Sequence, residues 1–226
     1  MTERGMIFNA EMVRALLDGR KMQTRRPVKF PVLDKNLRCE LAGNELAGEL
    51  SAGNYLNSAF GKPGDRIWVR EAYRFPASLD DVSPTGVGEI AVAAGYRKPW
   101  APTFYEFTGT FSDGWTGFET PPKVSGAGKL RPSIHMPRWT SRITLEITDV
   151  RVERLNSIHD VDAMREGIQN LTTCSHADFG IPGVVNAQHP VRAFQLLWES
   201  IYGAESWKAN PWVWVVEFKR IEERAA

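Results

Sequence analysis

The segment Trp212-Val-Trp-Val-Val-Glu-Phe218 restricts the possible folds more than any other part of the chain. Six of its seven residues are apolar, so an extended chain would carry apolar side chains on both sides here. Such a strand needs cover on both faces, unlike a surface strand in which apolar and polar residues alternate. We therefore expect an α+β fold in which short strands form a small, partly open β-barrel with helices packed outside it.

The N-terminal part of the chain predicts a strand followed by a helix. Residues 5–8 are expected to form the strand. Asn9 suits the N-cap of a helix over 9–18, because its side-chain oxygen can accept hydrogen bonds from free backbone amides. Gly19 suits the left-handed conformation that ends a helix, which places residues 21–26 on the segment that leaves it.

Three further strands are expected between residues 64 and 155. Gly64-Asp65 predicts a turn, and a strand follows from Ile67. Residues 142–155 alternate between apolar and polar side chains and predict a strand pair, with a kink or bulge at Thr148-Asp149.

Two helices are expected in the C-terminal part. Ser157 and Asp160 have the spacing of a capping box, which predicts a short helix that ends at Gly167. Pro190 predicts the start of a longer helix with one apolar face, which ends at Gly203.

Three segments are expected to be insertions in a single domain that spans residues 1–226. Residues 29–62 contain a Glu-Leu-Ala-Gly echo that is too short for a repeat fold, and we expect a loop with one helical turn. Residues 76–131 are rich in Gly, Pro, Ser and aromatic residues. There the spacing of Tyr105, Phe107 and Phe111 predicts a hairpin within a flap or small lobe. Residues 169–189 are expected to be a loop.

Composition limits the class of protein. The 226 residues are 42% hydrophobic and 24% charged, with a net charge of +1, which argues against a protein that coats nucleic acid but allows a local basic cleft. No apolar run reaches the ~20 residues that span a membrane, so we expect no membrane partner and a cytoplasmic location. The two cysteines, Cys39 and Cys174, are expected to be free thiols. The sequence carries no signal for an oligomeric state.

The segment Gly19-Arg-Lys-Met-Gln-Thr-Arg-Arg26 is the strongest candidate for chemistry. It holds an amine, a hydroxyl and three guanidinium groups between a glycine and Pro27. An amine three residues from a hydroxyl, among fixed positive charges, could activate a nucleophile or bind a phosphate.

This segment resembles the opening motif of the ASCH group of PUA-like domains, and in particular that of the small N4-acetylcytidine amidohydrolases. Residues 155–167 resemble the helix of that group that carries a functional glutamate. Residues 64–71 and 212–221 resemble its strand entry and its closing strand. The larger proteins with this pattern are mostly phage or prophage proteins. The resemblance implies a PUA-like barrel and covers about half of the chain.

The resemblance also implies that Lys21, Thr24 and Glu166 are the functional residues. A threonine hydroxyl needs a base within hydrogen-bond reach, and a lysine can be that base if burial or neighbouring cations lower its pKa. We expect hydrolysis of the amide on the exocyclic N4 of an acylated cytosine nucleoside, with Thr24 as nucleophile, Lys21 as base and Glu166 assisting the leaving amine. Neither a metal nor an organic cofactor is expected.

The same residues allow a second interpretation. Lys21 and Thr24 could contact phosphate in a cleft that binds RNA or a modified base, or in one that cleaves RNA, while Glu166 pairs with Arg26. Residues 131–139 mix cations with a histidine and an aromatic ring, as in surfaces that stack bases and hold phosphates, or form a well-packed loop. The candidate substrate-binding residues are Arg20, Arg25, Arg26, His135, Arg138 and Trp139.

A polar segment that contains Cys174, His176 and Asp178, with His189 beyond it, matches no zinc-binding spacing. We therefore expect a surface loop there and no metal site.

Overall fold

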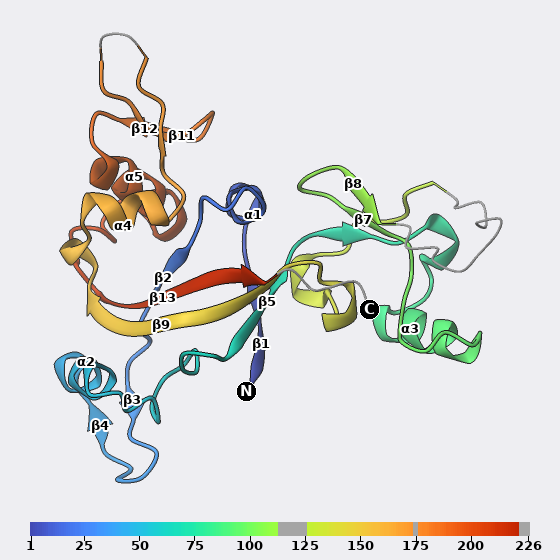
Figure 1. Ribbon diagram of the computed structural model, residues 1–226, viewed down its shortest axis with the longest axis horizontal. Coiled ribbons are helices and arrows are strands. Elements are labelled where there is room, and N and C mark those ends of the chain that lie inside the picture. Colours follow the sequence, from blue (N-terminus) through green and yellow to red (C-terminus); the bar gives the residue numbers. More distant parts are fainter. Residues whose placement is uncertain (113–125, 174–175, 222–226) are drawn as a thin grey trace. The chain divides into compact units, whose positions relative to one another are not determined.

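The computed structural model describes residues 1–112, 126–173 and 176–221 (Figure 1). The chain divides into two compact units, which are described separately. The first unit comprises Met1–Glu3, Ala15–Arg66 and Leu145–Ile221, and the second comprises Arg4–Arg14 and Ile67–Thr144, together with the last five residues, which lie outside the described ones.

The first unit is built on three neighbouring strands, in the order β9 (Thr144–Arg154), β13 (Trp212–Ile221) and β2 (Gln23–Pro27). β13 and β2 are antiparallel, with Thr24 opposite Val216. Four consecutive residues of β13, from Val213 to Val216, are buried. The prediction of a strand covered on both faces is therefore confirmed.

β9 is one continuous strand of 11 residues and not a pair of strands. Its buried side chains nevertheless switch from odd to even positions in the middle of the strand. Leu145 and Ile147 are buried before the switch, and Val150 and Val152 are buried after it. The change falls at the predicted position of the kink, Thr148-Asp149.

Two helices cover this part of the first unit. α5 (Pro190–Tyr202) packs against α4 (Asp160–Arg165) and begins and ends as predicted, with Gly203 as its C-cap. The predicted capping box at Ser157 is wrong, because Ser157 ends a short 3₁₀ helix, η4 (Leu155–Ser157), and α4 takes His159 as its N-cap. The core between the helices and β13 consists of Leu155, Ile158, Ala163, Ile168, Ile181, Ala193, Phe194, Leu197, Trp198, Val213 and Val215.

Two segments expected to be loops contain regular structure. Residues 29–62 form the hairpin β3 (Val32–Leu33) and β4 (Glu40–Leu41), followed by α2 (Gly43–Ser51). The second copy of the Glu-Leu-Ala-Gly echo, residues 45–48, lies in this nine-residue helix, whereas the first copy begins in β4. A hydrogen bond from the Ala42 amide to the Glu45 carboxylate stabilises the start of the helix. Residues 169–187 form a three-stranded antiparallel sheet of β10 (Gln169–Asn170), β11 (Phe179–Ile181) and β12 (Val185–Ala187).

In the second unit, β1 (Glu3–Ile7) is the neighbour of β5 (Arg66–Arg70). Gly5 packs against Trp68 and Arg70 of β5, where a Cβ atom would lie 2.7 Å from either side chain. The helix predicted after the first strand is α1 (Ala10–Leu17), and the Asn9 side chain accepts a hydrogen bond from the Met12 amide at 2.9 Å, which confirms the predicted cap.

The segment expected as a flap contains a hairpin and a helix. β6 (Tyr73–Arg74), β7 (Thr103–Tyr105) and β8 (Thr110–Ser112) form a three-stranded sheet, and Phe107 lies in the turn and not in a strand. α3 (Pro84–Ala93) was not predicted. Short 3₁₀ helices lie at η1 (Ala77–Leu79), η2 (Ser133–His135) and η3 (Arg138–Thr140). The core is formed by Tyr73, Phe75, Val87, Ala101, Tyr105 and Met136.

The fold is therefore mixed α+β, as expected. Among the described residues no sheet closes into a barrel. No helix in this part of the chain is long and apolar enough to cross a membrane.

Candidate active site

The end of α1 places Lys21. Gly19 has a φ of 72°, in the left-handed region, as the sequence predicts. The carbonyl of Ala15 then accepts hydrogen bonds from the amides of both Arg20 and Lys21, at 2.9 and 3.0 Å. These contacts turn the chain sharply at the end of the helix and direct it into β2.

Lys21 and Glu166 form a buried ion pair. The Lys21 Nζ donates hydrogen bonds to the Glu166 Oε2 and to the Glu166 backbone oxygen, both at 2.8 Å. The side chains are 0% and 3% exposed, respectively. The structure thus brings together two of the three residues predicted to be functional, although 145 positions separate them in the sequence.

Burial lowers the pKa of Lys21 from its usual 10.5, because the charged amine has lost its water. Contact with Glu166 acts in the opposite direction, and the nearby charges of Arg26 and Arg25 lower the pKa further. The net direction is downward, as a lysine base requires.

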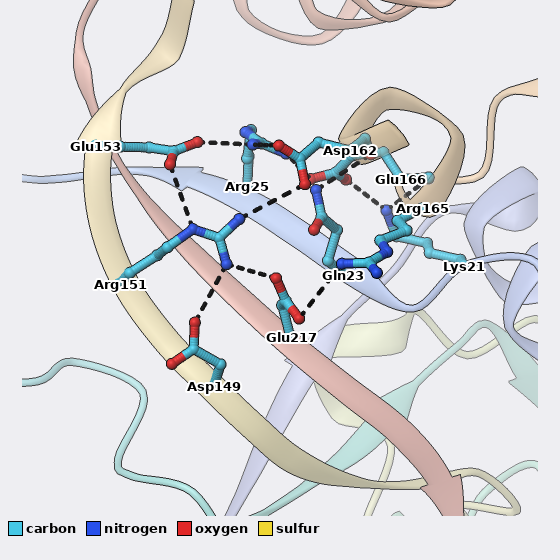
Figure 2. A network of polar contacts seen from close by, with 10 residues as sticks. All are labelled: Lys21, Gln23, Arg25, Asp149, Arg151, Glu153, Asp162, Arg165, Glu166 and Glu217. Atoms are coloured by element: carbon cyan, nitrogen blue, oxygen red, sulfur yellow. Dashed lines mark hydrogen bonds and ion pairs between the residues drawn. The ribbon is translucent and has the colours of Figure 1, made fainter. Parts of the chain in front are cut away.

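Arg25 lies beside this pair and contacts three carboxylates (Figure 2). Its Nη1 lies 3.3 Å from the Glu166 Oε1, and its Nη2 lies 2.7 Å from the Glu153 Oε1 and 3.4 Å from the Asp162 Oδ2. The Arg25 side chain is 0% exposed. Its charge is thus engaged inside the protein.

Arg151 of β9 extends the network toward the surface (Figure 2). Its Nε lies 3.3 Å from the Glu153 Oε2, and its Nη2 lies 3.6 Å from the Asp162 Oδ1. Its Nη1 contacts Glu217 of β13 and Asp149 of β9. Lys21, Arg25 and Arg165 are the other cations drawn in this view.

Gln23 is a buried polar residue of this site that the sequence did not single out. It is 0% exposed, and its Nε2 donates a hydrogen bond to the backbone oxygen of Asp162 at 3.1 Å. Its Oε1 has no hydrogen-bond partner within the described part of the chain. The signal in the sequence was the alternation Lys21, Gln23, Arg25, which puts three polar groups on one side of an extended chain.

Thr24 is buried, with 1% of its surface exposed. Gln23 and Arg25 both direct their polar groups to α4. Because side chains alternate along a strand, Thr24 points to the opposite face of β2. The structure therefore joins Lys21 to Glu166 and places the Thr24 side chain on the other side of β2.

The remaining predicted residues of the first segment lie nearer the surface. Arg20 is partly exposed and pairs with Asp18 at 2.8 Å. Arg26 is partly buried and stands opposite Trp214 in the ladder between β2 and β13, on the same face as Thr24.

The second predicted group belongs to the second unit. His135 is exposed, whereas Arg138 and Trp139 are partly buried. Trp139 stacks on Phe75 with an interplanar angle of 2° and a centroid distance of 5.6 Å, and Arg138 donates a hydrogen bond to the Thr144 hydroxyl. These are the packing contacts of an ordered loop.

Cys39 is an exposed free thiol. Cys174 lies outside the described residues, as do Trp115 and Phe118 of the predicted flap. Within the described residues, no group of three or more His, Cys, Asp or Glu side chains is arranged to hold a metal ion.

Comparisons of the chain with protein-family models, with curated proteins and with solved structures found no match.

Proposed function

We propose that the chain is an ASCH-type, PUA-like amidohydrolase that removes the acyl group from the exocyclic N4 of acylated cytosine nucleosides. One observation carries this proposal: Lys21 and Glu166, which come from two separate motifs of the resemblance, are in direct contact in a buried site. Burial also lowers the pKa of Lys21, which favours its role as a base.

The proposed reaction begins from the unprotonated form of the Lys21 amine: the Thr24 oxygen attacks the acyl carbon, and the hydroxyl proton passes to that amine. The bond between the acyl carbon and N4 then breaks, and the leaving N4 takes a proton held between Lys21 and Glu166. Water hydrolyses the acyl ester on Thr24 and releases the carboxylic acid. The cytosine nucleoside and the acid are the only products, so atoms and protons balance without a cofactor.

This mechanism sets one geometric requirement. Thr24 and the pair of Lys21 and Glu166 must come within hydrogen-bond reach, directly or through one water, when substrate is bound. The two residues between Lys21 and Thr24 include Met22, which precedes β2 and is 47% exposed. Because the Met22 amide donates to the Arg165 carbonyl at 2.8 Å and the Met22 carbonyl accepts from the Phe218 amide at 2.9 Å, meeting the requirement needs a rearrangement of β2 against β13. Substrate entry must also displace part of the cover over Lys21.

Binding of an RNA backbone is the alternative function, and the charges of the site favour it less. Lys21 and Arg25 are buried and engaged by carboxylates, so neither presents its charge to a phosphate. A site for phosphates would instead present an excess of positive charge.

The test is the change in ultraviolet absorbance when the purified protein is mixed with N4-acetylcytidine. Lys21→Met, Thr24→Val and Glu166→Gln should each abolish conversion to cytidine while the protein stays folded. Met22→Ala is the matched control, because it lies between Lys21 and Thr24 and is half exposed. Thermal unfolding of each variant separates loss of chemistry from loss of fold.

The outcomes separate the candidate functions. Full activity of Thr24→Val would remove Thr24 as the nucleophile and leave water in that role. No turnover of acylated cytidines by the folded wild type would overturn the proposed reaction. RNA affinity that falls steeply with salt would then support the binding function.

A further inference from the structure

Two arginines of the first unit are joined by two carboxylates, and each carboxylate uses one oxygen for each guanidinium. Glu153 contacts Arg25 through Oε1 and Arg151 through Oε2, at 2.7 and 3.3 Å. Asp162 contacts Arg25 through Oδ2 and Arg151 through Oδ1, at 3.4 and 3.6 Å. Figure 2 shows the two carboxylates between the two guanidinium groups.

This arrangement fixes the orientation of the Arg25 guanidinium group. Its Nη2 is held by Glu153 and Asp162, which leaves Nη1 directed at the Glu166 Oε1. The Glu166 Oε2 accepts from Lys21 at the same time. Both oxygens of Glu166 are therefore engaged, which restricts rotation of its carboxylate.

Asp162 also ties the start of α4 to β2. Besides its contacts with the two arginines, its backbone oxygen accepts a hydrogen bond from Gln23, and it lies in the helix that carries Glu166 at its C-cap. The network therefore holds both the Glu166 carboxylate and the C-terminal end of α4, from which Glu166 projects.

We propose that Arg25 is a positioning residue that holds Glu166 against Lys21, and that Arg151 keeps Arg25 in this orientation through the two shared carboxylates. The inference rests on the proposed function, because it assigns a role around the same Lys21 and Glu166. It changes the expectation for Arg25, from contact with substrate to orientation of Glu166.

Arg151 is 30% exposed, so we expect it to tolerate substitution better than Arg25 does. Without Arg151, Glu153 and Asp162 each have an uncompensated oxygen. Arg25 should then be drawn toward them and away from Glu166. Loss of Arg151 should therefore reproduce, more weakly, the loss of Arg25.

The experiment compares Arg25→Gln, Arg25→Lys and Arg151→Gln by two independent measurements. The first is kcat and KM for N4-acetylcytidine. The second is the titration of the Lys21 Nζ by NMR of protein labelled with ¹⁵N-lysine, in which Lys21→Met assigns the signal. Arg165→Gln is the matched control, since it also removes a cation next to Glu166 in the sequence, and among the described residues its guanidinium pairs with Glu217, at 3.8 Å, and not with Glu166.

We expect Arg25→Gln to lower kcat by about tenfold to a hundredfold, with KM nearly unchanged, because misorientation of a reacting group acts on the chemical step. Arg151→Gln should lower kcat less. Both should raise the pKa of Lys21, since the cation that opposes its protonation is lost or withdrawn. Arg25→Lys keeps the charge and should leave the pKa of Lys21 near that of the wild type while kcat still falls.

The two measurements distinguish failure of this inference from failure of the proposed function. If Arg25→Gln and Arg151→Gln are folded and match Arg165→Gln in both measurements, the positioning role is overturned while the reaction stands. If the wild type hydrolyses no acylated cytidine but the Lys21 titration shifts in both variants, the proposed reaction fails and the coupling through Arg25 is retained.

Discussion

The indole ring of Trp212 covers Gly43 so closely that a Cβ atom on Gly43 would lie 2.3 Å from the indole Nε1. Gly43 is the first residue of α2 and Trp212 is the first residue of β13. Glycine at this position therefore allows the helix of residues 43–51 to pack on the last strand of the first unit.

We predict that Gly43→Ala destabilises the protein by about 1–3 kcal/mol, because the added methyl group must push the indole out of place. Gly48→Ala in the same helix is the control. A Cβ atom there has no other atom within 4 Å, so this change should stabilise the helix by about 0.5–1 kcal/mol. Urea unfolding of the two variants measures both effects. Equal stabilisation by both changes would contradict the close packing at Gly43.

We predict that the difference in stability between the wild type and Lys21→Met depends on pH. Burial lowers the pKa of Lys21 below 10.5, although Glu166 acts in the opposite direction. Between the lowered pKa and 10.5, the unfolded chain binds more protons at this residue than the folded chain does, so the free energy of unfolding rises with pH.

The stability of the wild type relative to Lys21→Met should therefore increase as the pH rises toward 10.5. Urea unfolding at a series of pH values checks this. Lys219→Met provides the control, because Lys219 is 63% exposed and its removal should cause no comparable trend. A difference for Lys21→Met that shrinks with rising pH would show that the pKa of Lys21 is raised in the folded state.

We predict alkaline destabilisation through two buried tyrosines of the second unit. Burial raises the pKa of both Tyr73 and Tyr105 to about 12 from 10.0, although Arg131 and Arg142, respectively, act in the opposite direction. The folded chain keeps protons that the unfolded chain loses. The stabilisation is therefore present below pH 10 and is lost as the pH rises from 10 toward 12.

Tyr105→Phe should make the loss of stability above pH 10 less steep. At neutral pH it should cost about 1 kcal/mol, because the Thr140 backbone oxygen loses its 2.9 Å hydrogen bond. Tyr202→Phe is the control, since that ring is 38% exposed. The same slope in all three proteins would remove Tyr105 from the alkaline transition.

We predict that two bidentate ion pairs of similar geometry differ strongly in their effect on stability. Arg142 contacts Glu71 at 2.8 and 2.9 Å, and Arg74 contacts Glu106 at 2.7 and 3.2 Å. Glu71 is 1% exposed, whereas the Glu106 side chain is 39% exposed. Water can replace a cation only at the exposed carboxylate.

Arg142→Met should therefore cost about 3–5 kcal/mol, because it leaves the charge of Glu71 buried without a cation. Arg74→Met should have a much smaller effect. Thermal unfolding of the two variants under the same conditions makes the comparison, and equal losses would show that burial of Glu71 does not set the cost.

The sequence predicted those parts of the fold that depend on local patterns. The apolar run of β13, the Asn9 cap of α1 and the start of α5 at Pro190 were each visible over a few residues. α3 was missed because the glycine and proline content of its segment suggested a loop. Ser83 and Pro84 were in fact its start signals, and the Ser83 hydroxyl accepts from the Gly86 amide at 3.1 Å.

Prediction of the site from the sequence was limited in the same way as prediction of the fold. That Lys21 and Glu166 belong to one site was predicted from two motifs taken together. The roles of Asp162 and Arg151 were not predicted, because they depend on how α4 and β9 meet β2, which no local pattern specifies. The face of β2 to which Thr24 points depends on how β2 pairs with its neighbouring strand, and the sequence of β2 alone does not specify that pairing.

The pairing of β2 with β13 also determines when the first unit can form during synthesis. β2 begins at Gln23, whereas its partner strand ends at Ile221. β2 therefore leaves the ribosome long before the strand that pairs with it, and Arg25 remains hydrated until Glu153, Asp162 and Glu166 have also been translated. The native arrangement around Lys21 can therefore form only after residues 23–221 have all been synthesised, and β2 has no partner strand until then.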